Sequence, residues 1–107
     1  MPIENIALTE AVYYILLALH SPLHGYGIMQ KVGEMSGGRV RLAAGTLYGA
    51  IGTMLDKGWI NSLPGVQNSR KKEYQITDLG KKMAEGELHR LRELIANGER
   101  IIERMGN

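Results

Sequence analysis

Residues 44–58, AGTLYGAIGTMLDKG, contain the pattern on which the fold prediction rests. Apolar side chains recur here with the spacing i, i+3, i+4, i+7, i+10 and i+11, which is typical of one face of a helix. They are Ala44, Leu47, Tyr48, Ile51, Met54 and Leu55. Gly58 follows at a position where helices commonly end. The stretch therefore predicts an amphipathic helix with one buried face.

The opposite face of this predicted helix has almost no bulk. It carries Gly45, Thr46, Gly49, Ala50, Gly52, Thr53 and Lys57. Glycine costs ~1 kcal/mol relative to alanine at an exposed helix position, so three glycines need a reason. One reason is close packing against another helix. The other is close approach to a DNA groove, with threonine hydroxyls contacting bases or phosphates.

A β-hairpin is predicted downstream of this helix. Residues 59–63 and 73–77 are short strand-like segments, and residues 64–72 between them are rich in turn-forming residues. The connection ends in three consecutive cations, Arg70, Lys71 and Lys72. The tip of the predicted hairpin is therefore basic.

Two further helices are predicted upstream. Residues 9–20 are apolar nearly all round, with Thr9 as the N-cap, which indicates a buried helix. Pro22 ends that pattern. Residues 25–35 then show the spacing of a short amphipathic helix, and Ser36, Gly37 and Gly38 stop it.

The chain from Asp78 to its end is predicted to be a helix, with Thr77 as a candidate N-cap. Its apolar residues alternate spacings of three and four, as in the seam of a coiled coil. We expect homodimerisation through residues 83–105, with Leu88, Leu91, Ile95, Ile102 and Met105 in the interface. Packing of this seam onto its own domain remains the alternative.

Three helices followed by a basic hairpin predict a mostly α fold with a small β-hairpin, the winged helix-turn-helix, over residues 1–80. A long C-terminal dimerisation helix, residues 81–107, completes the prediction. In helix-turn-helix proteins the recognition helix enters the major groove, and the hairpin tip of the winged form reaches the flanking backbone.

The net charge is unevenly distributed along the 107 residues. It is −2 over residues 1–38, +5 over residues 39–82 and −1 over residues 83–107. The cations of the middle stretch fall just before the third predicted helix, at its end and on the hairpin. They include Arg39, Arg41, Lys57, Arg70, Lys71 and Lys72. This placement favours a polyanionic partner.

Several function classes are not supported. The absence of cysteine excludes disulfides and thiolate chemistry, and His20, His24 and His89 lie too far apart in sequence to indicate a metal site or a catalytic triad. We therefore expect neither an enzyme nor a cofactor. The longest apolar run has nine residues, against the roughly 20 that span a bilayer. No signal peptide is recognisable either, so a cytoplasmic location is expected.

Three motifs resemble the PadR family of transcriptional regulators over residues 9 to about 82. They are His24-Gly25-Tyr26-x-Ile28, then Gly45-Thr46-Leu47-Tyr48 running into Leu55-x-Lys57-Gly58-Trp59-Ile60, and Lys71-Lys72-x-Tyr74-x-Ile76-Thr77-x-x-Gly80. The chain resembles the short subfamily, in which one long C-terminal helix mediates the dimer.

The resemblance implies a homodimeric repressor that binds inverted-repeat operators through the third helix and the wing. It also implies that a small aromatic or hydrophobic effector can release the DNA. By position, Tyr48, Lys71 and Lys72 would face the DNA. The chain departs from the family pattern at Gly49, where a proline often follows the tyrosine, and at Asn68-Ser69, where the wing commonly opens with Gly-Arg.

The expected DNA-binding residues have distinct roles. Thr46, Gly49 and Thr53 are candidates for the groove, and the cations Arg39, Arg41, Arg70, Lys71 and Lys72 for phosphates. Tyr48 lies on the buried stripe by periodicity, yet its hydroxyl can reach a phosphate. Gly25 and Tyr26 open the second helix, whose N–H groups can hold a phosphate. A turn glycine and a core ring are the alternatives for these two.

Two questions of partnership stay open at this point. A winged-helix module that binds protein in place of DNA is the alternative function, although such a module would expose apolar residues on its third helix. An effector cavity at the dimer interface would use aromatic and methionine side chains such as Tyr13, Tyr14, Met29, Met35 and Trp59, which are equally explained as core.

Overall fold

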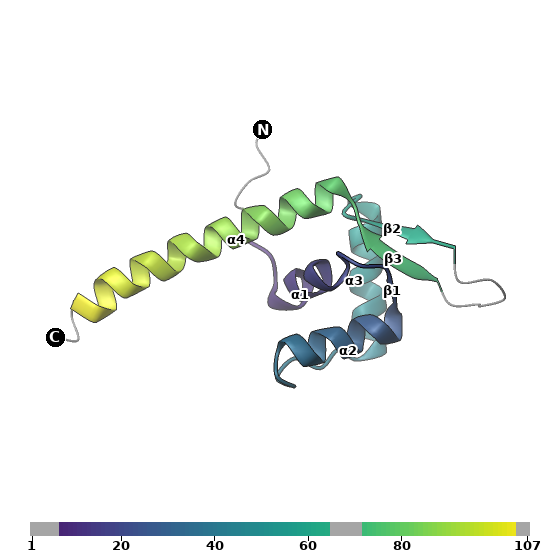
Figure 1. The fold of residues 1–107 in the computed structure, drawn as a ribbon, viewed down its shortest axis with the longest axis horizontal. Helices are drawn as coiled ribbons and strands as arrows, with labels where there is room; N and C mark the ends of the chain where they lie inside the picture. The colour runs from purple at the N-terminus through teal and green to yellow at the C-terminus, as the bar shows by residue number, and fades with distance from the viewer. Residues whose placement is uncertain (1–6, 65–71, 105–107) are drawn as a thin grey trace.

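The computed structural model describes residues 7–64 and 72–104, and Figure 1 shows their arrangement. The helices are α1 (Glu10–Ala18), α2 (Gly25–Met35), α3 (Ala44–Asp56) and α4 (Asp78–Gly98), which continues as a π-helical turn, η1 (Glu99–Glu103). The strands are β1 (Leu23–His24), β2 (Ile60–Leu63) and β3 (Glu73–Ile76). The mostly helical winged helix-turn-helix fold is thus confirmed.

The helix ends form where the sequence predicts them. Thr9 caps α1 by accepting a hydrogen bond from the backbone N–H of Val12, and Thr77 caps α4 by accepting one from Gly80. Gly58 adopts a φ of 76°, a left-handed conformation that glycine adopts without strain, directly after α3. Each cap satisfies a backbone group that the helix leaves unpaired.

The sheet has one strand more than the predicted hairpin. Its order is β1-β3-β2 with antiparallel pairing, and Leu23 and His24 of β1 lie opposite Tyr74 and Glu73 of β3. From the sequence, only a break in the helical pattern at Pro22 is expected in this region. A two-residue strand cannot show alternation, so its pairing with β3 leaves no pattern in the sequence.

The core lies between the helices and the inner face of the sheet. Its fully buried side chains are Ile15, Leu16, Leu19, Ile28, Val32, Leu47, Met54 and Ile60. The first turn of α4 sits directly on this layer, because a Cβ on Gly80 would overlap the carbonyl oxygen of Trp59 and lie 2.7 Å from Cγ1 of Ile76. Glycine at this position allows the close approach of α4 to the hairpin.

Helix α4 belongs to the core only in its first half. Met83, Ala84 and Glu87 are buried, whereas every residue from 92 to 104 except Gly98 is exposed. Figure 1 shows the helix running from the sheet out to the far side of the molecule, away from the hairpin. The second half therefore forms an arm that the described part of the chain does not cover.

The buried carboxylate of Glu87 holds the N-terminal segment to this helix. It pairs with Arg90, at 2.7 and 2.8 Å, and accepts a hydrogen bond from the backbone N–H of Leu8 at 3.3 Å. The Arg90 hydrogen bonds, helped by that from Leu8, lower the pKa of Glu87 against the opposing effect of burial. A buried charge satisfied in this way costs the fold little.

Candidate nucleic-acid interface

The outer face of α3 is open. Ala44, Gly45, Thr46, Gly49 and Thr53 are all exposed, whereas Leu47, Ile51 and Met54 are buried on the opposite side. A Cβ added at Gly45, Gly49 or Gly52 would meet nothing within 4 Å. Close packing of this face against another helix is therefore not found within the described residues, and a bare helix surface remains.

The candidate groove residues Thr46, Gly49 and Thr53 share this bare surface. They stand at i, i+3 and i+7, so they form one row along the helix. The hydroxyl of Thr53 donates a hydrogen bond to the carbonyl oxygen of Gly49 at 3.2 Å. The row therefore presents little more than methyl groups, hydroxyl oxygens and backbone.

Tyr48 is half-exposed rather than buried on the apolar stripe. Its exposed fraction is 52%, and its hydroxyl lies against Gly25, where a Cβ would overlap it. The apolar spacing of α3 is wrong at this position because the ring leans over the start of α2 instead of entering the core. Burial, and to a smaller degree the nearby Tyr48, raises the pKa of Tyr74.

The start of α2 is shaped by a histidine cap. Nδ1 of His24 accepts a hydrogen bond from the backbone N–H of Gly27 at 3.0 Å, and the ring lies 6.4 Å from that of Tyr26. Tyr26 is 60% exposed, so the alternative of a core ring is wrong. Gly25 is buried. Tyr26 and Tyr48 thus bring two exposed phenols to the first turn of α2.

The basic side chains divide into two groups. Lys72 is exposed at the start of β3 and Lys57 lies over the ring of Trp59, with Nζ 5.5 Å from the ring centroid. Arg70 and Lys71 lie outside the described residues. Of the described cations, Lys57 follows the end of α3 and Lys72 directly precedes β3.

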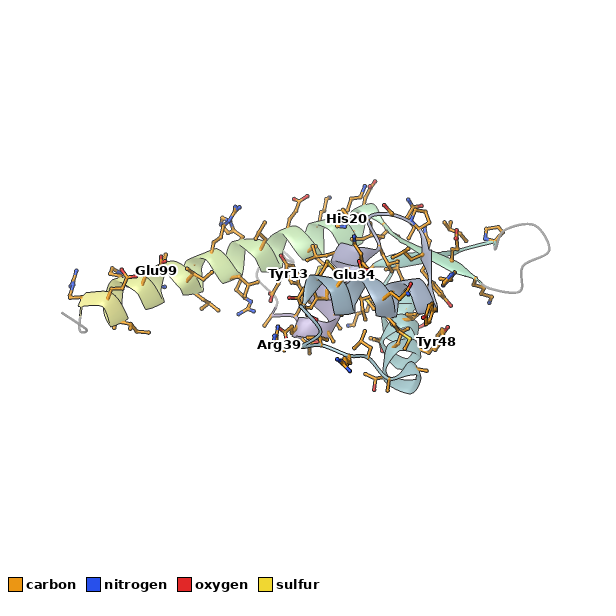
Figure 2. All side chains as sticks on the ribbon, turned by 60° about the horizontal axis from the view of Figure 1, so that its bottom comes forward. Tyr13, His20, Glu34, Arg39, Tyr48 and Glu99 are labelled. Carbon is orange, nitrogen blue, oxygen red and sulfur yellow. The ribbon has the colours of Figure 1, made fainter. Side chains whose placement is uncertain are left out.

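Arg39 and Arg41 lie elsewhere, on the connection between α2 and α3. Arg39 forms a bidentate ion pair with Glu10 of α1, and this pair lowers the pKa of Glu10 and raises that of Arg39. Arg41 is exposed and donates from Nε to the carbonyl of Gly38 at 3.2 Å. Figure 2 shows Arg39 far from Tyr48, near the other end of α2.

A cleft of about 310 Å³ lies between α1 and α4, away from α3. Its walls are Leu8, Glu10, Tyr13, Tyr14, Glu87, Arg90 and Leu91. Tyr13 and Tyr14 line this cleft, and they also pack against the core cluster, as do Met29, Met35 and Trp59. No metal-binding group of acidic and histidine residues occurs among the described residues.

The described helices also include none that is long and apolar enough to cross a membrane.

A family model, the Transcriptional regulator PadR-like family, matches residues 14–86, which is more than half of the chain. The chain belongs to this family. Its members are transcriptional regulators, so the family assignment is to a class of regulators and not to a class of enzymes.

Three relatives show the extent of the similarity. An uncharacterised 37.1 kDa protein in a transposon from Streptomyces fradiae is 33% identical over 86 residues, 79% of this chain, and the chain spans only 24% of its length. A PadR family transcription regulator from Clostridium difficile is 26% identical, with a TM-score of 0.73, and 86% of this chain matches 97% of that one.

The third relative is the PadR protein of Bacillus subtilis in complex with operator DNA. It is 30% identical with a TM-score of 0.57, and 65% of this chain matches 41% of that protein. The PadR-like chain described here is therefore similar to a protein that has been seen on its operator.

Sequence reasoning missed two residues that shape this interface. His24 stands in the first family motif and among three widely spaced histidines, and neither pattern indicates a cap, although a histidine directly before a predicted helix can serve as one. Glu10 was not singled out, because nothing in the sequence places it beside Arg39, 29 residues away. Its position in the first turn of α1 was the only local signal.

The histidine cap makes a testable prediction about the PadR-like fold. Replacing His24 with Ala should lower the free energy of unfolding by about 1 kcal/mol, because the Gly27 N–H loses its acceptor. Replacing it with Asn should retain most of the stability, since asparagine is a strong N-cap. Urea unfolding followed by circular dichroism measures both variants. Equal stability of the Ala variant and the unaltered protein would show that the cap contributes nothing.

Proposed function

We propose that this chain is a sequence-specific, double-stranded DNA-binding regulator that inserts the outer face of α3 into the major groove. The observation that carries the proposal is the bare surface around Thr46, Gly49 and Thr53, which has no intramolecular partner in the described part of the chain. A surface without bulk lets backbone and short side chains approach base edges.

The surroundings of that surface fit the phosphate backbone on both sides. The exposed phenols of Tyr26 and Tyr48 stand at the start of α2, and Lys72 stands on the wing beside Arg70 and Lys71 in sequence. Hydroxyl groups and cations are common phosphate contacts and fix the register of a protein on the duplex. The operator complex of the Bacillus subtilis relative supports the same assignment.

The two remaining arginines take different parts in this proposal. Arg41 is exposed and uses only Nε on the Gly38 carbonyl, so its terminal nitrogens can donate to a phosphate near the start of α3. Arg39 must first leave Glu10, so its contribution to binding is the smaller one. Exposed ion pairs are weak, and a strong phosphate field can compete with a carboxylate.

The oligomeric form we propose is a homodimer joined through the exposed half of α4. Leu88, Ile95 and Ile102 are 39%, 58% and 71% exposed, and Leu91 lies half-buried between them. Met105 lies outside the described residues. Large apolar side chains on an uncovered arm favour a second copy of the same arm, since their spacing is that of a coiled-coil seam.

A dimer with two copies of α3 matches an operator with inverted half-sites, and occupancy of such a site near a promoter gives repression. We also propose that a small aromatic or hydrophobic effector releases the DNA. The cleft beside Tyr13 and Tyr14 supports such a site, because it adjoins Leu91 of the proposed dimer arm. An effector bound in this cleft would change how α1 and α4 pack against each other.

The proposed function is tested by selecting duplexes from a random pool with the purified protein at moderate salt. We expect an inverted repeat to be enriched, with half-sites one helical turn or a multiple of it apart. A pool that stays random while binding remains salt-sensitive would reduce the protein to a non-specific DNA binder. Retention of no duplex would favour the protein-binding module.

The wing is tested by its contribution to salt dependence. Changing Lys71 and Lys72 together to Ala should weaken binding to every duplex and reduce the slope of log K against log salt by roughly two, because two phosphate contacts are lost. Fluorescence anisotropy titrations at four salt concentrations measure the slope. Lys31→Ala, on exposed α2 surface away from the wing, is the matched control. An unchanged slope in the double variant would remove the wing from the interface.

The dimer arm is tested by placing a charge in its seam. Ile95→Arg should yield a monomer in sedimentation velocity, because a desolvated cation would face its symmetry mate. The matched control is Glu93→Arg, an exposed residue on the side of the same helix opposite the seam, which should remain dimeric. A persistent dimer of the Ile95 variant would place the interface elsewhere on the molecule.

A further inference from the structure

We infer that this protein selects its operator by packing the methyl groups of Thr46 and Thr53 against thymine 5-methyl groups, and not by hydrogen bonds to purine edges. The inference rests on the proposed function, since it takes the outer face of α3 as the surface in the major groove. It adds the chemistry by which that surface distinguishes bases, and it predicts A·T pairs at the selective positions.

The first observation is the set of side chains that α3 does not contain. Bidentate readout in the major groove uses Arg or Lys for guanine and Asn or Gln for adenine. None of these four residue types occurs in residues 44–56. Asp56, the last residue of α3, is exposed and continues the row at i+10, where its carboxylate can accept from cytosine but cannot donate to a purine edge.

The second observation is independent of the first and concerns Thr53. Its hydroxyl donates to the Gly49 carbonyl of its own helix at 3.2 Å, so the donor is already engaged. Thr53 is nevertheless exposed. What it retains for a partner is its methyl group and the acceptor capacity of its oxygen.

Tyr48 lies between Thr46 and Thr53 in sequence, but its hydroxyl is directed to another element. The hydroxyl of Tyr48 lies against Gly25 at the start of α2, so this side chain is directed toward α2. Its place beside the first turn of α2 suits a phosphate. The bases are therefore left to the threonines and to the backbone between them.

The row has the dimensions that methyl contacts require. Thr46 and Thr53 are two helical turns apart, about 10.5 Å, which is close to three base-pair steps of ~3.4 Å. The space around Gly45, Gly49 and Gly52 is empty, so the backbone can come near enough for such short side chains to touch the bases. The thymine methyl is the apolar group that projects into the major groove.

The expected size of the effect follows from apolar burial. Removing one buried methyl group should lower affinity about fourfold. The operator of a dimer presents each position twice, once in each half-site. Loss of the same thymine methyl from both half-sites should therefore lower affinity roughly sixteenfold.

The experiment uses the duplex enriched by selection and replaces its thymines with deoxyuridine, one symmetric pair at a time. Deoxyuridine keeps every hydrogen-bonding group of thymine and lacks only the 5-methyl group. We expect a loss of roughly sixteenfold at one or two positions in the half-site. Deoxyuridine outside the half-sites is the control and should have no effect.

Paired substitutions assign the contact to the threonine methyl groups. Thr46→Val and Thr53→Val keep a methyl at the same place and lose the hydroxyl, so they should retain affinity and the deoxyuridine penalty. Thr46→Ser and Thr53→Ser keep the hydroxyl and lose the methyl. They should lose affinity for the thymine duplex and show little further loss with deoxyuridine. Serine and valine have similar helix propensities, so the four variants should fold alike.

Two results would overturn the inference while leaving the proposed function intact. One is an enriched duplex that binds equally well with deoxyuridine at every position. The other is retention of affinity by the Ser variants with loss in the Val variants, which would assign readout to hydroxyl hydrogen bonds. Failure of the selection to enrich any duplex would instead overturn the proposed function, and this inference with it.

Discussion

The burial of Leu47, Ile51 and Met54 is the constraint on which the rest of the structure depends, because it decides which face of α3 looks outward. These three side chains meet the α1 and α2 residues Leu16, Ile28 and Val32 in one core. Once that face is fixed, the glycines and threonines of the opposite face have only solvent beside them. Packing within the described residues therefore does not require their low bulk.

The start of α2 links this face to the wing. His24 lies in β1, which pairs with β3 of the hairpin, and its ring also caps α2. The hydroxyl of Tyr48 reaches the same turn from α3. Three elements therefore converge on the two-residue strand β1, which links the phenols and α3 to the start of β3. The relative placement of such elements matters in a DNA-binding protein, since phosphate contacts set the register in which base contacts form.

Local signals predicted most of this architecture, and long-range contacts account for what they missed. The caps at Thr9 and Thr77, and the stop at Gly58, are properties of a few neighbouring residues, so the sequence shows them directly. The pairing of β1 with β3 joins residues about 50 positions apart and has no local pattern. The same holds for the ion pair of Arg39 with Glu10, which changes what Arg39 can contribute.

Tyr48 shows a different limit of periodicity. The spacing places it on the buried stripe of α3, but the ring lies at the edge of that stripe, extends past the core boundary and is half-exposed. The hydroxyl of the ring lies against Gly25, the first residue of α2. The His24 cap fixes where α2 begins, and so helps to determine how much of the ring is exposed. The candidate site is thus predictable as a set of residues, whereas the direction of each side chain follows from packing between helices.

The second half of α4 is not covered by any described residue, although the first half is packed on the core. Its first half is fixed by the Thr77 cap, the close approach at Gly80 and the buried pair of Glu87 with Arg90. The second half, residues 92–104, continues that helix for roughly 20 Å, so its direction is set by the part that is docked on the core. An isolated segment of this length is marginal in water. Coverage of Ile95 and Ile102 by an identical arm would stabilise it, and the rigid continuity of the helix would then fix the separation of the two α3 surfaces. The distance between operator half-sites is, on this argument, set by the same residues that dock α4 on its own domain.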